Sequence, residues 1–176
     1  LLTNRRDLAA AARRFRDGGR REGAHVAYSE GINSRLDELQ AALLRVSLRH
    51  LRRWNRQRAA LAARYDRWLE GLPPETVQRL PRNSWGNSAN HLYVIRASRR
   101  DALRNYLLRQ GIETAIHYAP PLHLQPGFGW LGYRKGDFPH AERAAREILS
   151  LPLHPLLTRR QADRIAAHIL RFYQRR

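Results

Sequence analysis

Residues 34–69 read SRLDELQAALLRVSLRHLRRWNRQRAALAARYDRWL, and the expected architecture of the chain follows from this stretch. Apolar side chains recur in it at helical spacing, which predicts one long amphipathic helix. The stripe comprises Leu36, Leu39, Leu43, Val46, Leu51, Trp54, Leu61, Tyr65 and Leu69. Ser34, with Asp37 three residues later, predicts an N-cap and an acid in the first turn, and Gly71 predicts the end. We expect most of the stripe to pack in the core, with Trp54 and Trp68 buried against a partner element or subunit.

Shorter elements are predicted on either side of the long helix. Before it, the spacing predicts a helix over 5–16, followed by a loop over 20–32. After it come a strand over 91–96, a helix over 101–109, a strand over 112–116, a Pro- and Gly-rich loop over 117–137, and helices over 139–149 and 159–173. Thr158 and Gln161 have capping-box spacing at the start of the last helix. The fold class is therefore α/β to α+β, a long helix joined to a small α+β domain.

Length and composition favour a folded domain with a packed core. The chain has 176 residues, of which 43% are hydrophobic and 27% charged, and it has no cysteine. No apolar run approaches the ~18 residues of a membrane span, and the N-terminus lacks the order of a signal peptide. These features agree with a cytoplasmic protein and give no reason to expect a membrane partner.

The net charge of +18 first suggests a nucleic-acid partner. However, Lys135 is the only lysine among 33 basic residues, and the arginines are spread along the chain without a long basic run. Phosphate binding does not require such an exclusion of lysine. A basic nucleic-acid-binding module stays an alternative, but we favour a compositional preference for arginine over a nucleic-acid footprint.

The residues at the start of the long helix favour an anion site. Free backbone N–H groups at a helix start attract phosphates, and here Asn33 and Arg35 add an amide donor and a cation. The eight histidines instead raise the question of a metal site. No two of them have the i, i+4 spacing with an acid between them that is typical of zinc hydrolases, so we predict no metal site.

GINSRLDELQAA, from Gly31 to Ala42, resembles the signature of the DegT/DnrJ/EryC1/StrS sugar aminotransferases. These are enzymes that use pyridoxal phosphate to aminate keto sugars carried on nucleotides. The resemblance continues in the same order through Trp54 and residues 58–65, 91–94, 111–126, 139–142 and 149–155. It implies the C-terminal part of a fold type I (aspartate aminotransferase-like) enzyme dependent on pyridoxal phosphate.

The same resemblance implies a domain organisation. Residues 1–32 correspond to a remnant of the large cofactor-binding domain, 33–71 to a long domain-bridging helix, and 72–176 to the small C-terminal α+β domain. In the family, the N-terminal half supplies the lysine that forms the Schiff base. We expect Lys135, in the loop after the family's pattern, to be a solvated loop residue. The resemblance therefore assigns no catalytic residue to this chain and implies that it is inactive alone, with weak or no cofactor binding.

Site residues also follow from the resemblance. It implies that Asn33 reaches the cofactor phosphate in the neighbouring subunit, and that His117, Tyr118 and His123 line the sugar-nucleotide pocket. Arg35 is implied to be the companion cation, which binds either the sugar nucleotide or a structural carboxylate. The implied partners are a nucleotide-sugar substrate, an amino-acid donor such as glutamate, and either a second copy of the chain or a missing N-terminal half. A sugar dehydratase of the same fold, or a pseudoenzyme that pairs with an intact homologue, stays an alternative.

Overall fold

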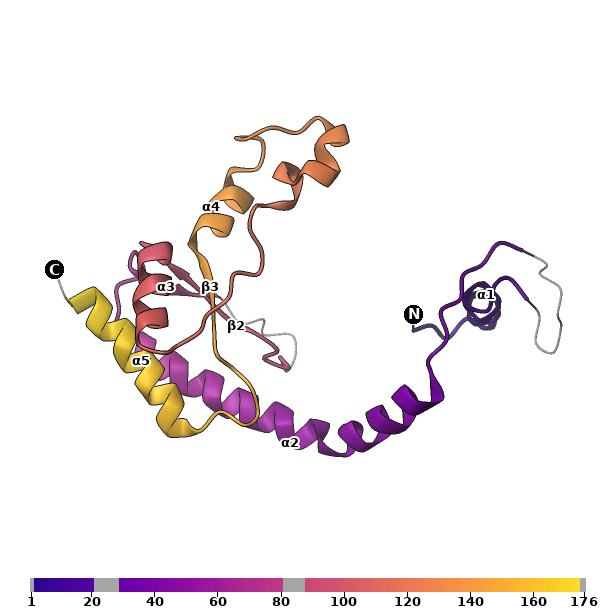
Figure 1. Ribbon diagram of the computed structural model, residues 1–176, viewed down its shortest axis with the longest axis horizontal. Coiled ribbons are helices and arrows are strands. Elements are labelled where there is room, and N and C mark those ends of the chain that lie inside the picture. Colours follow the sequence, from indigo (N-terminus) through magenta and orange to yellow (C-terminus); the bar gives the residue numbers. More distant parts are fainter. Residues whose placement is uncertain (1, 21–28, 81–87, 175–176) are drawn as a thin grey trace. The chain divides into compact units, whose positions relative to one another are not determined.

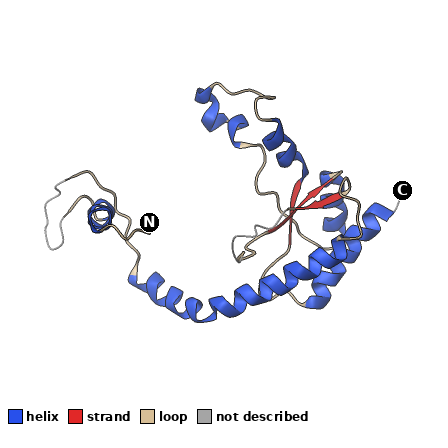
Figure 2. Cartoon of the chain, turned by 180° about the vertical axis from the view of Figure 1, so that it is seen from behind, coloured by secondary structure: helices blue, strands red, loops and turns tan. Residues whose placement is uncertain are grey.

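The chain divides into two compact units, Leu1–His50 (unit 1) and Leu51–Arg176 (unit 2). One continuous helix, α2 (Glu38–Leu69), begins in unit 1 and ends in unit 2. The computed structural model in Figures 1 and 2 describes residues 2–20, 29–80 and 88–174. The N-cap of α2 is Asp37, whose Oδ1 accepts the backbone N–H of Leu39 at 2.8 Å and that of Gln40 at 3.4 Å. The prediction of Ser34 as N-cap was wrong, because α2 begins at Glu38, directly after Asp37, while the N–H of Ser34 donates to the carbonyl of Arg16 at 2.8 Å.

Unit 1 is built on helix α1 (Arg6–Arg16), which confirms the helix predicted over 5–16. The segment before α2 returns along the end of α1: Ile32 N–H donates to Phe15 O at 2.7 Å, and Gly18 N–H donates to Ile32 O at 3.0 Å. Backbone approaches backbone so closely here that a Cβ on Gly31 would lie 2.1 Å from Gly19 N. This close approach therefore requires glycine at position 31. It sets the path of the backbone that leads into Asn33.

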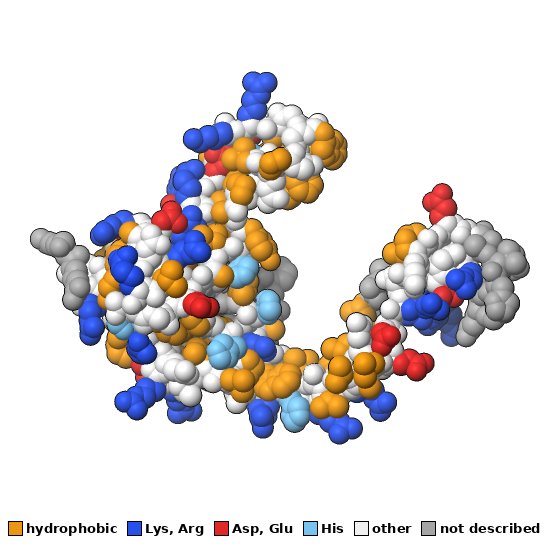
Figure 3. Space-filling view, viewed as in Figure 1, with side chains coloured by type: hydrophobic (Ala, Val, Ile, Leu, Met, Phe, Trp, Pro, Cys, Tyr) orange, Lys and Arg blue, Asp and Glu red, His pale blue; other side chains and the backbone are white. Residues whose placement is uncertain are grey.

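The apolar stripe of α2 is core only near the end of the helix. Its buried residues are Leu61, Ala62, Tyr65 and Leu69. In the first part of α2, by contrast, Leu39 is 70% exposed and Leu43 is 63% exposed, and Figure 3 shows hydrophobic side chains at the surface along the helix. The expectation of core packing along most of the stripe was thus wrong, because helical spacing identifies an apolar face but not a surface that covers it. Trp54 is half-buried, and Trp68 is 38% exposed.

Unit 2 contains a three-stranded antiparallel sheet in the order β1 (Val77–Arg79), β2 (Tyr93–Ala97), β3 (Ile148–Leu151). Alternate residues of β2 are buried, as expected for a sheet with one face in the core. Helices α3 (Arg100–Arg109) and α5 (Arg159–Gln174) add their buried side chains to the same core as the sheet and the end of α2. Both helices match their predicted ranges.

Three sequence-based assignments in unit 2 need correction. Strand β1 was not predicted. The strand expected over 112–116 is reduced to a single bridge between Ala115 and Ser150, because this segment meets β3 at that residue alone. The helix expected over 139–149 is α4 (Pro139–Glu147) and ends earlier, because Ile148–Leu151 pairs with β2 as β3. The loop over 117–137 contains two short 3₁₀ helices, η1 (Leu122–Leu124) and η2 (Pro126–Leu131).

The cap of α5 agrees with the sequence. Gln161 N–H donates to Thr158 Oγ1 at 3.2 Å, and Thr158 N–H donates to Gln161 Oε1 at 2.9 Å. These reciprocal hydrogen bonds confirm the predicted capping box. The two compact units do not coincide with the three-part division at residues 32 and 71, since the first unit extends to His50. That division stays a prediction.

Candidate functional site

The structure brings Asn33 and Arg35 together at the end of α1. Asn33 forms an isolated antiparallel bridge with Asp17. Arg35 Nε donates to Asn33 Oδ1 at 3.3 Å, and one terminal guanidinium nitrogen of Arg35 lies 3.3 Å from Asp17 Oδ1. In this arrangement the amide oxygen of Asn33 accepts a hydrogen bond from Arg35, and its NH₂ group can donate one to a bound ligand. Asp17 is a partner that the spacing of the sequence did not indicate.

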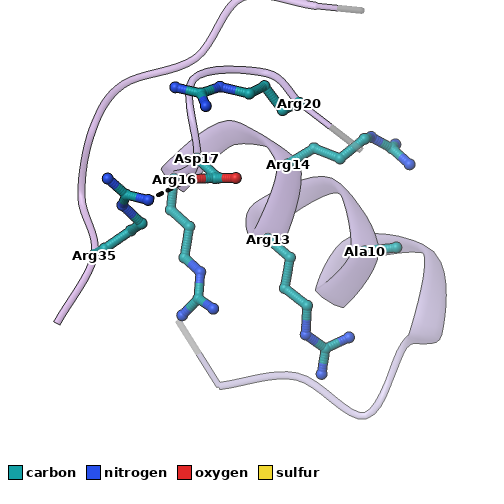
Figure 4. Close-up of a pocket in the computed structure, with 7 residues that line it drawn as sticks. All are labelled: Ala10, Arg13, Arg14, Arg16, Asp17, Arg20 and Arg35. Atoms are coloured by element: carbon teal, nitrogen blue, oxygen red, sulfur yellow. Dashed lines mark ion pairs between the residues drawn. The ribbon is translucent and has the colours of Figure 1, made fainter. Parts of the chain in front are cut away.

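A basic cleft of about 640 Å³ lies beside these residues. Figure 4 shows its lining, which consists of Ala10, Arg13, Arg14, Arg16, Asp17, Arg20 and Arg35. The lining thus carries five guanidinium groups and one carboxylate, so the cleft favours anions. Three of these arginines also lie in the last turn of α1, where they offset the negative end of the helix dipole. The cleft therefore has an electrostatic role in the fold as well as the charge to receive a phosphate.

His117 and Tyr118 are neighbours in unit 2 with different surroundings. His117 Nδ1 lies 2.8 Å from the Oγ of Ser150, a buried residue of β3. The ring of Tyr118 stands edge-on to that of His117 with centroids 5.2 Å apart, and Tyr118 is 74% exposed. His117 and Ser150 also line a second cleft of about 640 Å³, which has polar and apolar walls. His117 is therefore held by a defined contact, while Tyr118 presents its ring and hydroxyl to solvent.

His123 is enclosed. Its Nε2 lies 3.2 Å from Glu142 Oε1, and the two side chains are 8% and 7% exposed. The same oxygen of Glu142 accepts the Gly136 N–H at 2.6 Å. This backbone donor holds the pKa of the Glu142 carboxyl below its usual value against the opposing effect of burial, and His123 lowers it further. His123 thus belongs to a buried cluster with Glu142 rather than to the contact set of His117 and Ser150.

Sequence reasoning assigned no role to Glu142 or Ser150. Both lie in segments that carry the family resemblance, but neither spacing nor residue type distinguished them from structural positions. They are the two buried polar or charged residues among those that the structure describes. Burial of a polar group without partners is costly, and the hydrogen bonds of both are made across the fold, so only the structure identifies them.

The described residues contain no group of three His, Asp or Glu side chains that could hold a metal ion. In the same part of the chain, every helix is too short or too polar to cross a lipid bilayer.

A family model described as the DegT/DnrJ/EryC1/StrS aminotransferase family matches residues 1–170. The chain belongs to this family. Its relatives include the erythromycin biosynthesis sensory transduction protein EryC1 of Saccharopolyspora erythraea, which is 43% identical over 95% of this chain. A dTDP-3-amino-3,4,6-trideoxy-alpha-D-glucose transaminase of Streptomyces venezuelae is 42% identical over 94% of it.

Solved structures of DegT/DnrJ/EryC1/StrS proteins confirm the predicted fold class. DesV of S. venezuelae, in complex with a ketimine intermediate, superposes with a TM-score of 0.92 at 40% identity and covers 99% of this chain. A family aminotransferase of Brucella abortus covers 97%, with a TM-score of 0.86 at 35% identity. The match spans 46% of the DesV chain, 45% of EryC1 and 43% of the S. venezuelae transaminase. The chain therefore spans about half the length of these relatives.

Proposed function

We propose that this chain is the C-terminal part of an aminotransferase that uses pyridoxal phosphate to aminate a keto sugar carried on a nucleotide. The observation that carries the proposal is 42% identity, over 94% of the chain, to a transaminase named for a dTDP-linked amino sugar. Further relatives are named as transaminases of dTDP- and UDP-linked sugars, with the matches again covering most of this chain. The substrate class is therefore a nucleotide sugar, with an amino acid such as glutamate as donor.

The donor groups of Asn33 and Arg35 fit the phosphate of the cofactor. Arg35 engages the amide oxygen of Asn33, which leaves the amide NH₂ for a phosphate oxygen. The neighbouring arginines of α1 add positive charge on the same side of the chain. When bound, pyridoxal phosphate supplies the electron sink that amino-group transfer needs. Asn33 would hold the cofactor phosphate in a neighbouring subunit, with Arg35 as the companion cation toward the sugar nucleotide.

The substrate-contacting groups of unit 2 are proposed to be His117, Tyr118 and His123. Tyr118, the most exposed of the three, offers a face for stacking and a hydroxyl for hydrogen bonding. His117 is oriented by Ser150, so its other ring nitrogen can face a ligand. Because His123 is buried against Glu142, its part is to shape the wall of the site.

The catalytic lysine is proposed to come from outside this chain. Lys135 is its only lysine and lies exposed in the loop before α4, where it lacks the desolvated environment that activates an amine. Alone, the chain should bind the cofactor weakly and catalyse no transfer. Its partner is a second copy or a lysine-bearing N-terminal half.

The first test is reduction with borohydride after pyridoxal phosphate is added to the purified chain, followed by peptide mass spectrometry. We expect no stoichiometric label at Lys135, and a stoichiometric label there would overturn the assignment of the lysine to another segment. The second test adds a lysine-bearing half of a family member and measures amino transfer from glutamate to a nucleotide-linked keto sugar. Loss of water without amino transfer would identify a dehydratase instead.

A point variant tests the cofactor contact in the same assembly. Replacing Asn33 by Ala should weaken pyridoxal phosphate binding about tenfold, the effect of one hydrogen bond to a charged group. Ser34→Ala is the matched control, because Ser34 contributes a backbone N–H to the return along α1. Equal affinities of the two variants would contradict the role of Asn33.

A further inference from the structure

Glu142 attaches a long surface segment to helix α4. The segment 122–138 contains η1, η2 and the turn that precedes α4. Glu142, in the first turn of α4, is the one buried acidic residue in the part of the chain that the structure describes. A buried carboxylate is costly unless donors surround it, so the groups that face Glu142 indicate what its burial achieves.

The donors to Glu142 come from the segment itself. Oε1 accepts the Gly136 N–H at 2.6 Å and lies 3.2 Å from His123 Nε2. One oxygen atom thus holds the segment near its beginning and near its end. Gly136 has φ of +104°, which a residue with a side chain rarely adopts, so the turn that presents this N–H depends on glycine.

Aromatic rings close the same cluster. The ring of Phe138 packs against that of His123 with centroids 4.9 Å apart, and Tyr133 contacts Phe138 edge-on at 4.9 Å. The carboxylate is therefore enclosed by the segment that it holds. Hydrogen bonds of an ionised acceptor are shorter and stronger than neutral ones, and shielding from water strengthens them further.

We propose that Glu142 is a positioning residue that latches segment 122–138 against α4, and that the latched segment forms one wall of the nucleotide-sugar site. The first part stands on the contacts of Glu142 alone. The second part rests on the proposed function. Opening the latch would release His123 and the segment around it, while the core of unit 2, made by other residues, stays folded.

The sequence provides a direct probe of the latch. Lys135 is the only lysine in the chain, so a lysine-specific endoprotease has one site, the Lys135–Gly136 bond. The amide N–H of that bond is the one that Glu142 accepts. A protease must draw its substrate into an extended strand, so the cleavage rate follows the population in which this hydrogen bond is open.

The test compares Glu142→Gln with Glu147→Gln in the full chain. Both change the same residue type in α4, but Glu147 accepts Arg96 Nε of β2 at 2.8 Å and lies outside the latch. We expect cleavage of Glu142→Gln to be on the order of tenfold faster than wild type, with Glu147→Gln within about twofold, since only the first variant loses the charged acceptor of the Gly136 N–H. Equal rates for both variants, fast or slow, would overturn the latch.

A second measurement applies if Glu142→Gln fails to fold. In the wild-type chain, hydrogen exchange should show the Gly136 amide protected at neutral pH. Because Gly136 holds the carboxyl pKa of Glu142 below its ordinary value of 4.5, protection should persist above that value and decline as the pH falls below it. The charged or titratable group that faces Glu142 is His123, whose Nε2 lies 3.2 Å from Oε1. An unprotected Gly136 amide at neutral pH would overturn the latch.

The functional part is tested in the assembly with a lysine-bearing half. Glu142→Gln should raise KM for the nucleotide sugar several-fold, with kcat and the KM for glutamate within about twofold of wild type. An unchanged KM for the nucleotide sugar would overturn the positioning role. Absence of amino transfer in the wild-type assembly would overturn the proposed function, while the cleavage experiment still decides the latch.

Discussion

Tyr65 joins the end of α2 to the chain that follows β3, and its hydroxyl gives the most direct test of how unit 2 is held together. The side chain is fully buried, its ring packs on Tyr93 with centroids 4.9 Å apart, and its hydroxyl donates to the Pro152 carbonyl at 2.9 Å. Burial raises the pKa of Tyr65 far above its usual value, so the hydroxyl remains a donor throughout the physiological range.

Replacing Tyr65 by Phe removes one hydrogen bond and keeps the ring. The Pro152 carbonyl then loses this donor, and a buried hydrogen bond of this kind contributes about 1–2 kcal/mol to the free energy of unfolding. In a domain of this size, that loss lowers the melting temperature by about 3–8 °C. The packing on Tyr93 is unchanged, so the variant should still unfold cooperatively.

Thermal unfolding followed by circular dichroism measures the effect. Tyr118→Phe is the matched control, because its hydroxyl belongs to an exposed side chain, and its melting temperature should stay within about 1 °C of wild type. A Tyr65→Phe variant as stable as Tyr118→Phe would refute the reasoning, since the hydroxyl would then make no net contribution across these two elements.

Three further predictions concern stability and the exposed part of α2. Burial, together with nearby arginines, lowers the pKa of His168 below its ordinary value of 6.5. Folding therefore releases a proton, and stability should fall as the pH drops below about 6.5. Melting scans should show that His168→Asn loses less stability than wild type over this pH range. Asp163 accepts Trp68 Nε1 at 2.7 Å and pairs with an arginine of α2, so melting scans should show Asp163→Asn less stable than wild type at neutral pH. Because its pKa is lowered, chiefly by that arginine, the difference should disappear only as the pH falls below the ordinary aspartate value of 3.8. Replacing both Leu43 and Val46 by Ser should reduce binding of a hydrophobic dye without lowering the melting temperature, because both side chains are exposed.

Apolar periodicity and capping residues in the sequence were enough to predict helices α3 and α5 of unit 2. Periodicity placed α3 and α5 within one residue of their observed bounds, and the capping pair fixed the start of α5. Ile148 and Leu149 were misassigned as helix because their conformation depends on a distant partner: Leu149 lies opposite Ile95 in the sheet. Strand formation of this kind is decided by cross-strand pairing more than by the residues themselves.

The candidate site shows the same limit of sequence reasoning. Proximity in the chain was enough to associate Asn33 with Arg35, and the structure brings them into contact. Their link to Asp17 depends on the return of the chain along α1, which no local pattern specifies. The pairing of His123 with Glu142 likewise connects a loop to a helix, so the sequence did not indicate this buried contact, and the substrate contact of His123 stays a prediction.

The location of Asn33 and Arg35 explains why cofactor binding by this chain alone should be weak. They lie in unit 1, where α1 buries none of its side chains and the first part of α2 leaves its leucines exposed. Backbone hydrogen bonds along α1 hold this segment, but the apolar core contains none of the described residues of unit 1, so a ligand must bear more of the entropic cost of ordering it. A partner that covers Leu39 and Leu43 would supply that order before the cofactor arrives. Affinity for pyridoxal phosphate should therefore rise with partner concentration, and Leu39→Ser and Leu43→Ser should weaken cofactor binding although neither residue contacts the phosphate donors. Cofactor affinity that is independent of the partner and of these leucines would show that unit 1 is already ordered for binding.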